Sequence, residues 1–159
     1  MRKFPLLVCL TFAVNLTVNS IELHSSRIAY IQTTGRFINE QRLKANLVQQ
    51  AQGAPEILAQ LRKMGVTSDK NLRVLFYFYT NSDSKAKVFD SKLIKLGYTA
   101  KPRPAATIKD QYVVTGWTTK IKMDSDAVIA WAKKMCELGY KFDCDFDGWE
   151  TSPDAPENK

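Results

Sequence analysis

Between residues 71 and 151, strand-like runs of β-branched and aromatic residues alternate with segments that show the 3.6-residue period of α-helices. It predicts strand, helix, strand, strand, helix and strand at 71–80, 81–97, 98–104, 111–123, 124–139 and 140–151. This order is that of the ferredoxin-like βαββαβ unit. We therefore predict an α+β sandwich, in which two helices cover one face of a four-stranded antiparallel sheet and one or two further helices precede it.

The composition of the strands agrees with the strand order of that unit. The first strand, "NLRVLFYFYT" from Asn71, is an unbroken apolar run, as expected in the centre of a sheet. Pro102 and Pro104 remove N–H donors from the second strand, which predicts an edge position. Acids alternate with apolar residues in the fourth strand, and charges at an edge hinder pairing with another chain.

Residues 143–154, "DCDFDGWETSPD", also approach the calcium-loop pattern D-x-D-x-D-G-x5-E. A strand, however, spaces alternate residues about 7 Å apart, whereas a calcium loop curls its acids around one ion. Asp154 also stands where such a loop carries a bidentate Glu. We favour the strand, with Asp143, Asp145 and Asp147 directed to solvent and no metal site.

The N-terminus has the pattern of a secretory signal. Arg2 and Lys3 precede the apolar run "FPLLVCLTFAV" at 4–14, and small or β-branched residues precede a cleavage site after Ser20. We therefore predict that residues 1–20 are a signal peptide and that the chain is exported, periplasmic or secreted. After cleavage no stable membrane span is expected, and the alternative is an uncleaved anchor.

Three further segments follow the predicted signal. Residues 21–53 are expected to form a lead-in followed by a helix that ends at Gly53. Residues 54–152 are expected to form the domain itself, which begins with a helix that ends at Gly65. Residues 153–159 form an acidic tail.

Charge is unevenly distributed along the chain. Residues 21–141 hold 20 Lys and Arg against 10 Asp and Glu, whereas residues 142–159 hold one Lys against six acids. This distribution suggests an acidic partner, and solubility alone is the alternative.

The sequence lacks the residue sets that catalysis requires. His24 is the only histidine, and it precedes the predicted domain. One histidine and the two cysteines that remain after the signal are too few for a structural zinc site, and there is no Gly-rich phosphate loop. We therefore predict a protein that is not an enzyme and that has no cofactor.

A binding surface is predicted on the face of the sheet away from the helices. If Phe76 and Phe78 face the helices, Arg73, Tyr77 and Tyr79 face outward. Tyrosine provides contact area at small entropic cost, which favours a protein partner. RNA-recognition motifs share this strand order and stack bases on such aromatic residues. The third strand lacks their signature, and the acids of the fourth strand would repel phosphate, so a nucleic-acid partner is the less favoured alternative.

A disulfide between Cys136 and Cys144 is predicted if the chain is exported. Cys136 lies near the end of the second helix, and Cys144 lies on the inward side of the following strand. A turn at Gly139 would bring the two side chains together. The alternative is a pair of reduced, buried thiols.

Residues from about 55 to 152 resemble the ribonuclease E inhibitor B family, the B-type regulators of ribonuclease E activity. The resemblance rests on a helix ending in "LRKMG", an apolar first strand, "LGY" after the first helix, and a final "FDGWET". Asp147-Gly148-Trp149 is its most specific element, and these three residues join the candidate partner surface.

The resemblance implies the ferredoxin-like fold and a non-catalytic protein that binds an endoribonuclease and lowers its activity. Typical members are acidic and cytoplasmic, whereas this chain is basic and has an export pattern. We therefore predict an exported, non-catalytic binding or regulatory protein of unknown partner. The first alternative is a cytoplasmic inhibitor of an endoribonuclease, and the second is an RNA-binding module.

Overall fold

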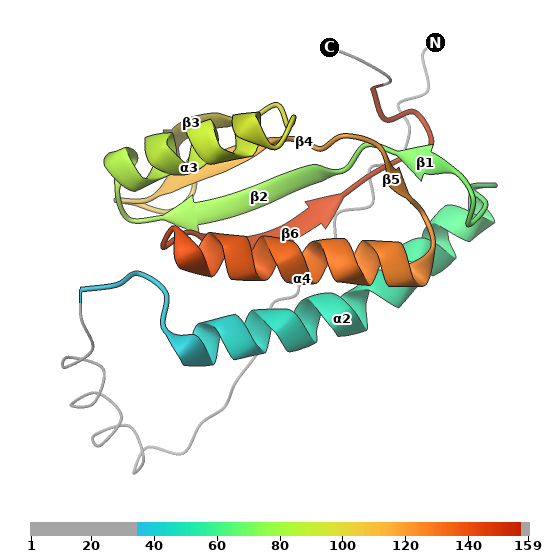
Figure 1. Cartoon of the computed structure of the whole chain (residues 1–159), viewed down its shortest axis with the longest axis horizontal. Helices are drawn as coiled ribbons and strands as arrows, with labels where there is room; N and C mark the ends of the chain where they lie inside the picture. Colours follow the sequence, from blue (N-terminus) through green and yellow to red (C-terminus); the bar gives the residue numbers. More distant parts are fainter. Residues whose placement is uncertain (1–34, 157–159) are drawn as a thin grey trace.

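The computed structural model describes residues 35–156. The predicted signal peptide, most of the lead-in and the last three residues of the tail lie outside this range. The elements follow one another along the chain as shown in Figure 1. They are α2 (Glu40–Lys63), β1 (Asn71–Leu72), β2 (Leu75–Thr80), α3 (Asp83–Lys95), β3 (Lys101–Pro104), β4 (Tyr112–Trp117), β5 (Ile121–Lys122), α4 (Ser125–Lys141) and β6 (Asp145–Glu150).

The main sheet has the strand order β3-β4-β2-β6, and each pair of neighbours is antiparallel. The first and third long strands therefore lie in the centre, and the proline-rich and acidic strands lie at the edges. This arrangement confirms the predicted ferredoxin-like α+β class.

Two of the predicted strands are each divided into two parts. β1 and β5 pair with each other in a separate two-stranded sheet, away from β2 and β4. Between the two sheets, the hydroxyl of Thr118 accepts a hydrogen bond from the Val74 N–H, and the Thr118 N–H donates to the Val74 carbonyl. At the point where the two sheets separate, the Thr118 side chain thus takes the place of one backbone acceptor in the β-ladder.

Aromatic side chains fill the space between the sheet and the helices. Phe76 and Phe78 alternate with half-exposed residues along β2 and are fully buried. The Phe78 ring contacts Phe89 of α3 and Phe146 of β6, with centroids 4.6 and 4.8 Å away. Burying each ring stabilises the fold by about 2–3 kcal/mol. The face of the sheet that carries Phe76 and Phe78 therefore forms part of the hydrophobic core.

α2 is one continuous helix, and the prediction of two helices separated at Gly53 is wrong. The helix passes through both Gly53 and Pro55 and is capped at its start by Asn39, whose side chain accepts from the Arg42 N–H at 2.8 Å. A buried stripe of α2 packs the helix against α4 and β6. These tertiary contacts outweigh the tendency of Gly53 and Pro55 to break a helix. The stripe consists of Asn46, Gln50, Ala54, Leu58 and Leu61.

Side chains of α2 cover the edge of β6. Asn46 donates to the Phe146 carbonyl at 3.2 Å and to the Asp145 carboxylate at 2.6 Å, and Gln50 reaches the Asp147 carbonyl at 3.5 Å. Arg42 forms an ion pair with Asp145 at 2.8 Å, and this hydrogen-bonded pairing raises the pKa of Arg42. Asp145 is therefore bound by α2, and not directed to solvent as predicted.

The predicted disulfide is wrong, because Cys136 and Cys144 are both free and buried. α4 does not stop at Gly139 but continues to Lys141, and the chain turns at Asp143, whose φ is 58°. The turn leaves the Cys144 thiol donating to the Phe142 carbonyl at 3.5 Å. Burial raises the pKa of each thiol to about 12, so both stay protonated and unreactive at neutral pH.

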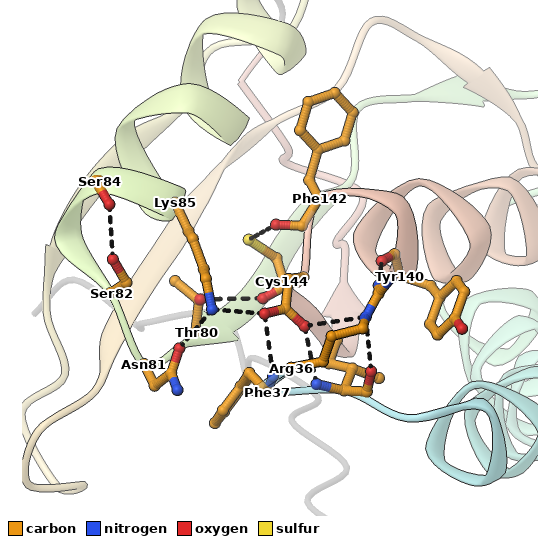
Figure 2. Close-up of polar contacts among 12 residues, drawn as sticks. Arg36, Phe37, Thr80, Asn81, Ser82, Ser84, Lys85, Tyr140, Phe142 and Cys144 are labelled. Carbon is orange, nitrogen blue, oxygen red and sulfur yellow. Dashed lines mark hydrogen bonds and ion pairs between the residues drawn. The ribbon is translucent and has the colours of Figure 1, made fainter. Parts of the chain in front are cut away.

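The Asp143 carboxylate, two residues before β6, joins α3 to the entry segment, residues 36–38, which leads into α2. Figure 2 shows Arg36, Phe37 and Lys85 gathered at this junction. It accepts from the backbone N–H groups of Phe37 and Ile38, both at 3.0 Å, and pairs with Lys85 at 2.6 Å. Arg36 lies 3.7 Å from it, and the guanidinium stacks over the Tyr140 ring at 4.3 Å. Asp143 is thus a partly buried junction, with its side chain 13% exposed, where the sequence predicted a solvated acid.

Candidate functional site

The outer face of the sheet carries a row of half-exposed residues from β2. Leu75, Tyr77 and Tyr79 alternate there with the buried residues of the core. In the register of the sheet, Thr115 of β4 lies beside Tyr77, and Trp117 lies beside Leu75. The two central strands therefore bring aromatic and apolar groups together on the face that α3 and α4 do not cover.

Tyr79 lies between opposite charges on that face. Val113 of β4 is its neighbour on one side, followed by the exposed Arg103 of β3, and Asp145 of β6 is its neighbour on the other. Partial burial raises the pKa of the Tyr79 phenol, the charge of Asp147 raises it further, and Arg103 opposes the shift. The hydroxyl therefore keeps its proton at neutral pH and can donate to a partner.

Tyr77 is held by the last residue of β6. Its hydroxyl donates to the Glu150 carboxylate at 2.6 Å, and Glu150 is only 4% exposed. The contact orients the ring before any partner arrives, which reduces the entropy lost on binding.

A β-bulge determines the orientation of the Asp147-Gly148-Trp149 triplet. The pairing of β2 with β6 shifts between Tyr77 and Phe78, so that Asp147 is an extra residue on β6. Gly148 then lies opposite Tyr77 on the outer face, and Trp149 lies opposite Phe76 on the inner face. A regular strand would have pointed Trp149 outward.

Trp149 belongs to the core. It is 8% exposed, and its ring meets Trp131 of α4 edge-on, with centroids 5.9 Å apart. Asp147, by contrast, is exposed at the bulge. Desolvation by neighbouring groups raises the pKa of its carboxyl, Asp145 adds to this shift, and Arg42 opposes it.

Arg73 does not reach the outer face with the tyrosines. It lies between β1 and β2, where the strand alternation is interrupted, and it is 8% exposed. Its Nε donates to the Thr118 carbonyl at 2.7 Å, and its own carbonyl accepts from the Thr151 hydroxyl at 2.6 Å. Of the six predicted surface residues, the structure brings together Tyr77, Tyr79, Asp147 and Gly148.

A small recess continues this surface at the β6 edge, and sequence reasoning missed it. Its volume is about 40 Å³, and it lies between α2 and the bulge. Positions 49, 53 and 57 are spaced to share one helix face, but nothing in the sequence pairs that face with β6, which follows about 90 residues later. The lining residues are Gln49, Gln50, Gly53, Ile57, Asp147, Gly148 and Trp149.

A larger apolar hollow of about 460 Å³ lies on the helical side of the sandwich. Leu96 and Tyr98 border it after α3, and Trp131, Met135 and Leu138 border it from α4. It gives the protein a second surface on which a partner could bind, and Leu96 is a convenient probe of it because its side chain is exposed.

Within residues 35–156, no group of three or more His, Cys, Asp or Glu could hold a metal ion. None of the helices in that range is long and apolar enough to cross a membrane.

The comparisons with known proteins identify one family. Residues 53–151 match the family model described as regulator of ribonuclease activity B. A comparison with curated proteins gave no match. The matched region includes the second half of α2, both sandwich helices and all four strands of the main sheet. Because the match covers more than half of its 159 residues, the chain belongs to the regulator of ribonuclease activity B family.

Proposed function

We propose that this chain is a non-catalytic regulator that binds an endoribonuclease of the ribonuclease E type through the outer face of its sheet. Membership of the family supports a ribonuclease-binding regulatory role. The observation that carries the choice of surface is the pair Tyr77 and Tyr79, half-exposed between the cationic β3 edge and the acidic β6 edge.

The chemistry of this face favours protein over RNA. Tyrosine rings are common anchors of protein interfaces, where charged rims add specificity. Asp147 is exposed at the β6 edge, close enough to act on the Tyr79 phenol, and its charge disfavours a phosphate backbone. A protein partner with mixed charge fits the surface better than a nucleic acid.

Replacing Tyr79 with alanine is expected to weaken binding to purified endoribonuclease by at least tenfold, because an interface anchor is worth about 2 kcal/mol or more. The dissociation constant is measured by biolayer interferometry, and inhibition by the rate of cleavage of a fluorescent RNA substrate. Leu96→Ala serves as the matched control, because it truncates an exposed apolar side chain on the helical hollow. If Leu96→Ala weakens binding and Tyr79→Ala does not, the outer face is the wrong surface.

A second candidate is an exported binding protein, which the basic and apolar N-terminus favours. Such a protein would not meet a cytoplasmic ribonuclease and would need a partner outside the cytoplasm. Cell fractionation followed by N-terminal sequencing of the native protein distinguishes the two candidates. If the second candidate is right, the mature chain begins at Ile21 in the exported fraction, whereas an intact Met1 in the cytosol would reject export.

A further inference from the structure

We infer that the recess between α2 and the β6 bulge receives an extended, positively charged segment of the partner protein, whose backbone lies across Gly148 and Gly53. This inference rests on the proposed function, because it requires a protein partner. It adds the place where the partner chain approaches most closely and the charge of that chain.

Gly148 has no role in the fold that requires a glycine. A Cβ built there would meet no atom within 4 Å, and its φ is not in the left-handed region. The neighbouring bulge therefore does not require it. Because glycine weakens a strand, its use there points to close approach by another backbone.

Gly53 presents the same situation on the facing helix. It lies inside the continuous α2, where glycine is less favourable than alanine. A Cβ there would also meet nothing within 4 Å, and its φ is also not left-handed. Gly53 of α2 and Gly148 of β6, neither of which the fold requires to be glycine, thus line one recess.

The size of the recess indicates a surface contact and not a small-molecule pocket. Its volume of about 40 Å³ is far below the several hundred Å³ of ordinary ligand sites. Gly148 lies beside Tyr77 in the sheet, so the recess extends the outer face proposed to bind the partner. An extended chain that crosses the tyrosines would continue over this glycine.

The charge at the recess indicates the chemistry of that segment. Asp147 is exposed, and no hydrogen bond or ion pair to its carboxylate is formed within residues 35–156. Asp145 is already bound by Arg42 and Asn46, which leaves Asp147 as the available anion. A lysine or arginine of the partner would complement it.

The test compares Gly148→Ala and Gly53→Ala with wild type in two measurements. Neither variant should lower the thermal midpoint, because each added methyl enters open space and alanine is the better residue in both elements. Both should weaken binding to purified endoribonuclease by at least tenfold in biolayer interferometry. Asp147→Lys should weaken binding by at least tenfold in low salt, with a smaller effect in high salt.

Ser91→Ala on α3, away from the sheet's outer face, is the matched control and should bind like wild type. If wild type itself does not bind the endoribonuclease, the proposed function fails and this inference fails with it. If wild type binds and Tyr79→Ala weakens binding, but both alanine variants bind normally, only this inference is overturned. A lower thermal midpoint for both glycine variants would also overturn it, because the glycines would then serve the fold.

Discussion

A Gly139→Ala variant is expected to have a free energy of unfolding lower than that of wild type by about 2 kcal/mol or more. The added Cβ would lie 2.3 Å from the Cys144 carbonyl oxygen and 2.9 Å from the Phe78 ring. The carbonyl belongs to a fixed turn, in which the Cys144 N–H donates to the Gly139 carbonyl at 2.8 Å. The higher helix propensity of alanine stabilises the variant by only about 1 kcal/mol, so the steric clash dominates.

Urea unfolding followed by circular dichroism measures this loss. Gly148→Ala is the matched comparison, because the same methyl group enters open space there and should not destabilise the protein. An unchanged midpoint for Gly139→Ala would show that α4 and β6 are further apart than the structure places them.

Replacing Asp143 with alanine is expected to lower the free energy of unfolding by about 2–3 kcal/mol at pH 7. The substitution removes the acceptor of two backbone N–H groups and leaves Lys85 without its ion pair. Solvent screens the charges of Lys85 and Arg36, which are partly exposed, so the ion pairs contribute only a small part of this loss. Asp143→Asn should lower the free energy of unfolding by a smaller amount. Asn also tolerates the left-handed backbone at this position, and its side-chain carbonyl can still accept a hydrogen bond.

The effect of Asp143 should also depend on pH. Burial alone raises the pKa of this carboxyl, but hydrogen bonds from Lys85 and from the backbone of Phe37 and Ile38 outweigh burial and lower it. Because its pKa is lower in the folded state than in the unfolded chain, the Asp143 carboxylate stabilises the fold at every pH above the ordinary pKa of aspartate. This stabilisation is lost as the pH falls through the lowered pKa of the folded state.

Urea unfolding of wild type and both Asp143 variants between pH 7 and pH 2 tests this linkage. The difference between wild type and Asp143→Ala should shrink at the acid end. Asp154→Ala, at an exposed turn, is the control and should follow wild type throughout. A difference that stays constant with pH would mean that the carboxylate charge does not stabilise the junction.

The predictions from sequence succeeded where the signal is local. Side chains in β2 alternate between core and surface, and those in α3 and α4 repeat with the helical period, so the burial of Phe76, Phe89 and Trp131 follows from spacing alone. Prolines in β3 and acids in β6 indicated edge strands because they act on the backbone of their own strand. The outward position of Tyr77 and Tyr79 follows from the same alternation.

The predictions failed where one residue interrupts the local period. A single extra residue at Asp147 moves Trp149 from the outer to the inner face, and the sequence offers no sign of the bulge. Gly139 was predicted to end a helix, but it is required by the close approach of Cys144, which only the packed structure contains. The disulfide prediction depended on that turn and failed with it.

The sequence by itself therefore determined the βαββαβ order and the two faces of the sheet, because hydrophobic period is a property of neighbouring residues. Only the tertiary structure decided that α2 passes through Gly53, that Asp143 anchors the entry segment, and that α2 and β6 form a recess. Each of these depends on contacts between residues more than 60 positions apart. Such contacts form when the chain buries its apolar surface, and no short window of sequence encodes them.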